Sequence, residues 1–326
     1  MSPMRRRDQR PRAPVARLAA VALALVTGLT ACSTADDESA VQRGDINFAV
    51  GRLEDALAEY RLAVRQGADD PAVQARVAHT YARLGRVDLA AENYRTAVSL
   101  DAGLANQALS DLMRMAREAQ LSGDRFAMAT AVEAALALEP TVGVGDIALP
   151  LARHYFQNGE YGQALPFYQI AMAEMRDSTP DIVFEVGQAY EEIGDCEHAL
   201  VFFERFRERV RPWERAEVDW YIGTCSFNVA RDLLARSTAG EQEMERALTL
   251  LDRALEVGEP RNIQARAWFE KGETLADLGR CEEAMEAYAQ VRYADQAGAL
   301  IDRAQAAFDE IRFGRGLESF RGGRCR

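Results

Sequence analysis

Residues 71–102 read PAVQARVAHTYARLGRVDLAAENYRTAVSLDA, and this stretch decides the fold. It predicts two helices joined by a turn at Leu84-Gly85-Arg86, because glycine suits the position that ends a helix. Small and aromatic residues recur at helical spacing on one face of each helix: Val77, Ala78 and Tyr81 on the first, and Ala90, Tyr94 and Ala97 on the second. A helix pair of this size cannot bury both apolar faces alone, so we expect the pattern to recur.

The pattern does recur, with a period of 34 residues. Gly51, Ala56, Tyr60 and Ala63 precede Gly85, Ala90, Tyr94 and Ala97 by that distance. The unit resembles the tetratricopeptide repeat, which has this period, a glycine turn and an Ala-x3-Tyr-x2-Ala second helix. The resemblance implies a right-handed helical solenoid that binds other proteins, without identifying the partner.

The sequence therefore predicts an all-α fold, a tetratricopeptide solenoid of about seven helix-turn-helix repeats over residues 41–313. The expected repeats span 37–70, 71–104, 109–142, 145–178, 180–213, 216–260 and 265–298. An end helix at 299–313 is expected to cap the last repeat, and a Gly- and Arg-rich tail follows at 314–326. The sixth repeat carries 12 extra residues, which we expect to lengthen its first helix to about Ala235.

The first 31 residues are typical of an export signal. A basic stretch is followed by an apolar run at 18–29, which is too short to span a bilayer comfortably. Leu29-Thr30-Ala31-Cys32 resembles the bacterial lipobox, and that family carries a lipid on the cysteine after cleavage. The resemblance implies a lipid anchor at Cys32, with 32–40 as anchor and linker. Ser33 implies the outer membrane under the enterobacterial sorting rule. The alternative is an ordinary secretory signal with a chance cysteine.

The charge balance limits the classes of partner that the protein can bind. The chain has 39 basic and 51 acidic residues, and removing residues 1–31, with six Arg and Asp8, leaves 33 basic and 50 acidic, a net charge near −17. A surface this acidic is unsuited to nucleic acid and to a polybasic membrane contact. We therefore expect protein partners, with the lipid as the contact to the membrane.

No catalytic, cofactor or metal motif stands out, and we expect no enzyme activity. His79, His154 and His198 fall in three different repeats. Cys196-Glu197-His198 could be read as metal ligands, but Cys196 occupies a packing position at a helix start. The Gly-Val-Gly of residues 143–145 lacks the strand and the Gly-Lys-Ser/Thr of a phosphate loop, so a linker is the better interpretation.

The family resemblance implies that fixed positions of each first helix line a peptide groove. Carried over, they give an apolar column of Ala75, Met113, Leu149, Phe184 and Phe269. Beside it runs a polar column of His79, Arg117, Arg153, Gln188 and Glu273, with Arg83 adjacent. The first half is basic and the second acidic, with Glu191, Glu192 and Asp277. We expect an extended acidic or C-terminal peptide to bind Arg83, Arg117 and Arg153. The alternative is a solvated face with chance clustering of charges.

An exported chain meets an oxidising compartment, so the four remaining cysteines, Cys196, Cys225, Cys281 and Cys325, suggest two disulfides. Four cysteines allow three pairings. Antiparallel neighbouring helices in a solenoid favour Cys196 with Cys225, and an end helix running back favours Cys281 with Cys325. The alternative is four buried thiols.

The favoured function is a membrane-anchored periplasmic scaffold that binds proteins in the assembly or stabilisation of an envelope complex. In architecture the chain resembles the pilotins of type IV pilus secretins and the tetratricopeptide lipoprotein of the barrel-assembly machine. A non-catalytic accessory subunit of a cell-wall or polysaccharide-processing system is the alternative. A substrate-binding lipoprotein is disfavoured because a solenoid lacks an enclosed pocket.

Overall fold

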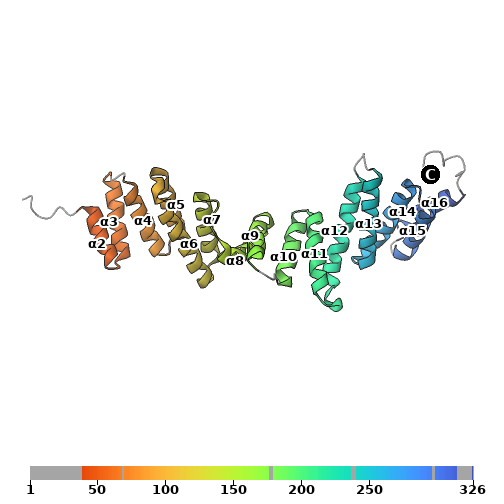
Figure 1. Cartoon of the computed structure of the whole chain (residues 1–326), viewed down its shortest axis with the longest axis horizontal. Coiled ribbons are helices and arrows are strands. Elements are labelled where there is room, and N and C mark those ends of the chain that lie inside the picture. The colour runs from red at the N-terminus through yellow and green to blue at the C-terminus, as the bar shows by residue number, and fades with distance from the viewer. Residues whose placement is uncertain are drawn as a thin grey trace, which may run out of the picture. The chain divides into compact units, whose positions relative to one another are not determined.

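The computed structural model describes residues 39–67, 70–175, 179–235, 240–295, 298–313 and 325. Within these ranges the secondary structure is helical, with no strand, and the helices form antiparallel pairs (Figure 1). The prediction of an all-α repeat fold is therefore confirmed. The signal segment, Cys32 and most of the tail lie outside the described residues.

The contacts divide the chain into two compact units, Met1–Leu112 and Met113–Arg326, and the division falls within helix α6. The sequence predicted one array over 41–313, and we describe each unit by itself. Unit 1 contains α2 (Ala40–Ala49), α3 (Leu53–Arg65), α4 (Pro71–Arg83), α5 (Val87–Leu100), the 3-10 turn η1 (Ala102–Leu104) and the start of α6 (Ala105–Ser122).

Unit 2 holds the remaining helices. They are the rest of α6, α7 (Arg125–Leu138), α8 (Gly145–Gln157), α9 (Tyr161–Glu174), α10 (Pro180–Glu192), α11 (Cys196–Arg209), the 3-10 turn η2 (Pro212–Glu214), α12 (Ala216–Leu234), α13 (Glu241–Val257), α14 (Arg261–Asp277), α15 (Cys281–Ala294) and α16 (Ile301–Phe313). We call α4, α6, α8, α10, α12 and α14 first helices, and α5, α7, α9, α11, α13 and α15 second helices.

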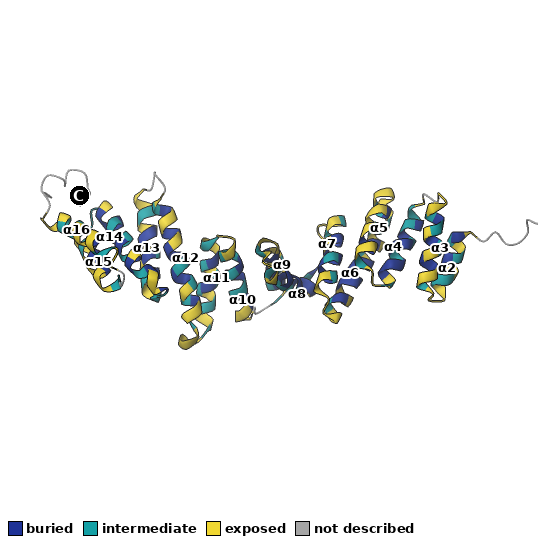
Figure 2. Ribbon diagram, turned by 180° about the vertical axis from the view of Figure 1, so that it is seen from behind, coloured by how far each residue is buried: buried dark blue, intermediate teal, exposed yellow. Residues whose placement is uncertain are grey.

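In three helix pairs a glycine packs against an aromatic ring of the second helix. In unit 1, a Cβ on Gly44 would lie 2.5 Å from the Tyr60 ring. In unit 2, a Cβ on Gly187 would lie 2.7 Å from the ring of Phe203, which is fully buried. Such distances leave no room for a side chain, so glycine sets the spacing of these two helix pairs. Figure 2 shows the resulting pattern, with buried residues on the facing sides of the helices.

Two helices begin earlier than the repeat pattern predicts. Helix α6 starts at Ala105 and α14 at Arg261, each four residues before the expected repeat starts at 109 and 265. Asp101 accepts a hydrogen bond from the Gly103 amide and opens η1, which continues into α6. The residue before α14 is Pro260, in the extended conformation of a helix N-cap. A local cap therefore overrides the period at α6, and α14 begins directly after Pro260.

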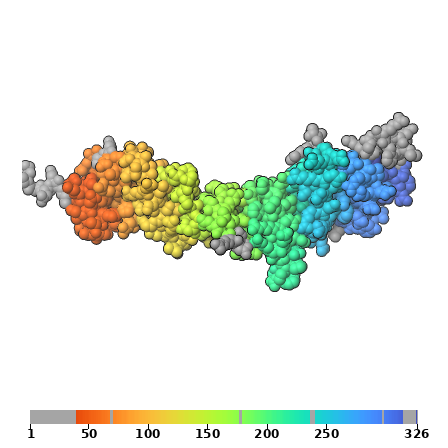
Figure 3. Space-filling view, in the orientation of Figure 1, coloured from red at the N-terminus to blue at the C-terminus, as the bar shows by residue number. Residues whose placement is uncertain are grey.

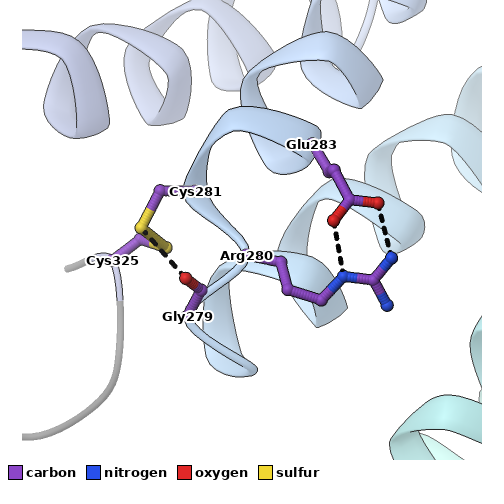
Figure 4. Close-up of a disulfide and its surroundings, with 5 residues drawn as sticks. All are labelled: Gly279, Arg280, Cys281, Glu283 and Cys325. Carbon is purple, nitrogen blue, oxygen red and sulfur yellow. Dashed lines mark hydrogen bonds and ion pairs between the residues drawn. A yellow bond between two sulfur atoms is a disulfide. The ribbon is translucent and has the colours of Figure 1, made fainter.

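Two disulfides join elements of unit 2, and they are the pairings favoured from the sequence. Cys196 of α11 is joined to Cys225 of α12, with Cα atoms 5.0 Å apart. Cys281 of α15 is joined to Cys325, with Cα atoms 5.5 Å apart (Figure 4). Cys325 also donates its amide to the carbonyl of Ala276, at 3.0 Å. One disulfide thus joins two neighbouring helices, α11 and α12, and the other joins Cys325 to α15.

None of the helices that the structure describes has both the length and the apolar character needed to cross a membrane.

Candidate protein-binding face

The apolar column expected on the first helices is largely closed. Ala75 of unit 1 and Met113 and Phe269 of unit 2 are buried, whereas Leu149 and Phe184 are half-buried. The Arg303 guanidinium lies 4.7 Å from the centre of the Phe269 ring and covers it. Three of the five side chains pack inside the helix layer, so most of the predicted column offers a peptide no open surface.

The arginines expected to form a basic half of the groove are paired with carboxylates. In unit 2, Arg117 donates to Asp146 at 2.6 Å, and Arg153 donates to Glu185 at 3.0 Å. Each partner lies on the next first helix along the chain. The hydrogen bond from Arg117 lowers the pKa of Asp146. The hydrogen bond to Glu185 raises the pKa of Arg153. This corrects the expectation of free positive charge, because an acidic peptide would have to displace these carboxylates.

In unit 1 the histidine of the polar column, His79, is also paired with a carboxylate. The Nδ1 of His79 lies 2.6 Å from an Asp111 oxygen, and the Tyr94 hydroxyl donates to the same oxygen. Arg83 is exposed, with its guanidinium 5.9 Å from the centre of the Phe48 ring.

A three-residue node recurs with fixed spacing in both units. A base on a first helix, a tyrosine 15 residues later and a carboxylate 17 residues after that meet in His79–Tyr94–Asp111 and in Arg153–Tyr168–Glu185. Both side chains bond the same carboxylate oxygen, which therefore links one repeat to the next. These polar residues serve the joint between repeats, which leaves them less available to a partner.

Between the fifth and sixth repeats, an uncharged pair stands in place of the base and its carboxylate. Here Gln188 donates to the Tyr221 hydroxyl at 3.1 Å, and the Phe203 ring stacks on Tyr221 with centroids 4.8 Å apart. The Phe184 ring meets Tyr221 edge-on at 5.7 Å, and Trp220 meets it edge-on at 5.1 Å. The result is a contiguous group of aromatic rings from α10, α11 and α12.

Trp220 is the member of this group that reaches solvent, with 44% of its surface exposed. It is a first-helix residue 36 positions after Phe184, so it continues the apolar column through the sixth repeat. The column predicted from the sequence did not include it, although Gly223, 36 residues after Gly187, gives the same register. A large exposed aromatic ring on rigid helices is the kind of side chain that anchors protein interfaces.

Acidic residues lie on both first helices that carry rings of this group, α10 and α12. Helix α10 carries four acidic residues and no basic one: Asp181, Glu185, Glu191 and Glu192. Burial, with a smaller contribution from the Glu192 charge, raises the pKa of Glu191. At the start of α12, Glu217 is exposed. Glu191 and Glu192 of the predicted acidic half lie at the end of α10, and Trp220 lies near the start of α12. Elsewhere in unit 2, Glu273 accepts a hydrogen bond from Tyr288 at 2.6 Å, and Asp277 is exposed.

The residues considered as metal ligands have other partners. Cys196 is in a disulfide, and the Nδ1 of His198 lies 2.6 Å from an oxygen of Asp195, at the N-cap of the same helix. His154 is buried, with its ring 5.2 Å from that of Phe126. The described ranges contain no group of three or more side chains arranged to hold a metal ion.

Comparison with family models gives two matches along the chain. Residues 72–103 and residues 233–299 each match a model described as tetratricopeptide repeat. The first covers α4 and α5, and the second runs from the end of α12 to the α15–α16 loop. The chain contains tetratricopeptide repeats. The period, the glycine turns and the small-aromatic helix pairs quoted at the outset are those of this repeat.

Solved structures of tetratricopeptide proteins resemble the chain at low identity. The C-terminal part of a tetratricopeptide protein from Cytophaga hutchinsonii is 17% identical, with 80% of this chain and 97% of that chain covered and a TM-score of 0.31. A tetratricopeptide protein from Parabacteroides merdae is 14% identical over 83% and 98%, with a TM-score of 0.29. The tetratricopeptide protein YrrB is 17% identical over 76% and 97%, with a TM-score of 0.30. No curated protein matches the chain.

Proposed function

We propose that this tetratricopeptide protein is a non-catalytic, membrane-anchored scaffold that binds protein partners in the bacterial envelope through the first helices of repeats five and six. Tetratricopeptide proteins generally mediate protein–protein interactions. The proposed place of the binding site rests on Trp220, a tryptophan of α12 that is exposed and packs edge-on against Tyr221. The proposed role is to help assemble or stabilise an envelope complex.

The partner segment that fits this face is basic and contains an apolar side chain. All the charged residues of helix α10 are acidic, and Glu192 is exposed. A positively charged segment therefore gains favourable contacts along this helix. The partly exposed ring of Trp220 can pack against an apolar or cationic side chain. Arg117 and Arg153 already bind carboxylates, which disfavours the acidic peptide expected from the sequence. Arg83 remains a candidate contact on unit 1.

Removal of the exposed ring tests the proposal, and the chain offers a matched control. Trp213 is 72% exposed but lies on η2, at the α11–α12 corner, which stands out from unit 2 in Figures 1 and 3. We expect Trp220→Ala to abolish capture of cross-linked envelope partners, and Trp213→Ala to leave capture unchanged. Helical circular dichroism should be the same for both. Equal capture by the two variants would exclude the α10–α12 face as the binding site.

The envelope location rests on the sequence of residues 1–40, and the proposal places the chain at the periplasmic face of the outer membrane through a lipid on Cys32. The two disulfides support an oxidising compartment, since paired cysteines persist outside the cytosol.

A further inference from the structure

Helix α16 is held in place by little side-chain burial. It has one buried residue, Ala304, whereas the neighbouring helix α15 has four. A space of about 140 Å³ lies between the two helices, lined by Tyr288, Ile301 and Phe308 among others. Helices with few buried contacts are among the first parts of a protein to open by local unfolding. Contacts other than side-chain packing therefore matter for the docking of α16.

Two such contacts lie on either side of α16 in the sequence. Before the helix, the Asp295 carboxylate at the end of α15 accepts hydrogen bonds from the amides of Gly298 and Leu300, at 3.0 and 2.6 Å. After the helix, a disulfide joins Cys325 to Cys281, the first residue of α15 (Figure 4). It closes a loop with a sequence separation of 44 residues, and α16 lies within this loop. Closing the loop limits the open conformations of α16 and so favours the docked one.

The two cysteines of this disulfide differ in exposure. Cys325 is 7% exposed, belongs to the same hydrophobic cluster as Ala304, and donates its amide to the Ala276 carbonyl at 3.0 Å. Cys281 is half-buried at the α14–α15 turn, so an external thiol can approach it more easily. Its Sγ lies 3.4 Å from the Gly279 carbonyl oxygen, which can accept a hydrogen bond from a Cys281 thiol once the disulfide is open.

Helix α16 covers an apolar ring of the first helix α14. The Arg303 guanidinium of α16 lies 4.7 Å from the centre of the Phe269 ring, and Phe269 is 8% exposed. Phe269 is also a member of the apolar column that the sequence predicted for the peptide groove. Displacement of α16 would therefore uncover this position of the seventh repeat.

We propose that the Cys281–Cys325 disulfide is a redox switch, and that its reduction by a dithiol oxidoreductase releases α16 and uncovers Phe269. A thiolate of the oxidoreductase attacks the Cys281 sulfur and displaces Cys325 as a thiolate, which takes up a proton. The second thiol of the oxidoreductase loses its proton and attacks the mixed disulfide, so Cys281 leaves as a thiolate and is protonated. Two electrons reach the chain, and the oxidoreductase keeps the disulfide. The switch goes beyond the proposed scaffold role and does not depend on the α10–α12 face.

The other disulfide provides a matched control. Cys196–Cys225 joins α11 to α12, and α12 has nine buried residues, including Cys225 itself. Loss of this disulfide lowers stability but leaves α12 packed on both neighbours, so it should not release α16.

Amide hydrogen exchange in the full chain, followed by mass spectrometry, measures the opening of α16. We expect residues 301–313 to exchange about tenfold faster in the variant Cys281→Ser with Cys325→Ser than in the oxidised unaltered chain. The variant Cys196→Ser with Cys225→Ser should exchange at the unaltered rate in α16, until dithiothreitol opens its 281–325 disulfide. Equal protection of α16 with and without this disulfide would overturn the proposal. So would equal acceleration in α14, α15 and α16, because the disulfide would then stabilise the whole repeat.

Two further measurements test the reductant and the ring. A thioredoxin, used as the dithiol reductant, should make Cys281 and Cys325 available to alkylation while Cys196 and Cys225 stay joined. Hydroxyl-radical labelling of Phe269 should rise after this treatment. Simultaneous opening of both disulfides, or unchanged labelling of Phe269 after 281–325 has opened, would contradict the proposed switch.

Discussion

Gly187 determines how closely the two helices of the fifth repeat approach. An added Cβ would lie 2.7 Å from the Phe203 ring, which is fully buried and cannot move without disturbing Tyr221. The two residues stand at the small and aromatic positions of the repeat pattern, where the second repeat has Ala78 and Tyr94.

We therefore expect Gly187→Ala to destabilise unit 2 by about 1–3 kcal/mol through overpacking. The matched control is Gly162→Ala in α9, where a Cβ would meet nothing within 4 Å. Alanine there should stabilise the helix by up to about 1 kcal/mol. Urea unfolding followed by circular dichroism gives both values. A Gly187→Ala variant as stable as the control would contradict the packing described here.

Tyr168 links two repeats through its hydroxyl, which donates to Glu185 at 2.9 Å. Burial, followed by the Glu185 charge and hydrogen bond, raises the pKa of Tyr168. Removing the hydroxyl in Tyr168→Phe should cost about 1–2 kcal/mol at neutral pH. Tyr293→Phe, at a site 78% exposed, should cost nothing measurable.

The sign of the pH effect follows from the raised pKa of Tyr168. Its contribution to stability is complete below its ordinary pKa of 10.0 and is lost as pH rises above that value, because the unfolded tyrosine ionises first. The Tyr168→Phe variant should therefore lose less stability than the unaltered chain between about pH 10 and 11. Parallel losses in the two proteins would argue against a buried, protonated Tyr168.

The repeat pattern predicted which residues pack in the core better than it predicted which polar residues pair with one another. The polar column that contains His79, Arg117 and Arg153 was identified from the repeat register, but the carboxylate partners of these residues were not. Each partner lies 29 or 32 residues further on, on the next first helix, at a position that the packing pattern of the repeat does not specify. A search for acidic residues one repeat after each base would have found Asp111 and Glu185.

At the scale of helices, the period predicted the order of elements but not all their ends. Helix α6 begins four residues early because Asp101 caps η1, which continues into α6, and α14 begins four residues early directly after Pro260. A 34-residue period encodes neither start. The disulfide pairing, in contrast, was accessible from the sequence. Antiparallel neighbouring helices bring cysteines equidistant from a turn to the same height, as they do for Cys196 and Cys225.

The Cys196–Cys225 disulfide closes a loop with a sequence separation of 29 residues. The chain-entropy model predicts that it stabilises unit 2 by about 3.5 kcal/mol. A double variant, Cys196→Ser with Cys225→Ser, should unfold at correspondingly lower urea than the unaltered oxidised chain. The matched comparison is the unaltered chain under reducing conditions, and it should show at least the same loss. Non-reducing peptide mapping must also recover the 196–225 and 281–325 linkages, and a 196–281 linkage would contradict the structure.

At the scale of the whole molecule, the proposed lipid on Cys32 determines where the scaffold acts. Changing Cys32→Ala should abolish labelling by a palmitate analogue and move the protein from the membrane fraction to the soluble fraction. Cys281→Ser, which removes a cysteine of the repeats, should leave both properties unchanged. Retention of Cys32→Ala in carbonate-washed membranes would show that the anchor lies elsewhere.

The central claim is that the chain binds a protein partner at the first helices of repeats five and six. The most direct measurement places a photo-cross-linking amino acid at position 220, or at position 213 as the control, in the full chain within living cells. The account predicts discrete cross-linked partner bands from position 220 that are absent from position 213. No protein cross-link at 220, or the same bands from both positions, would contradict it.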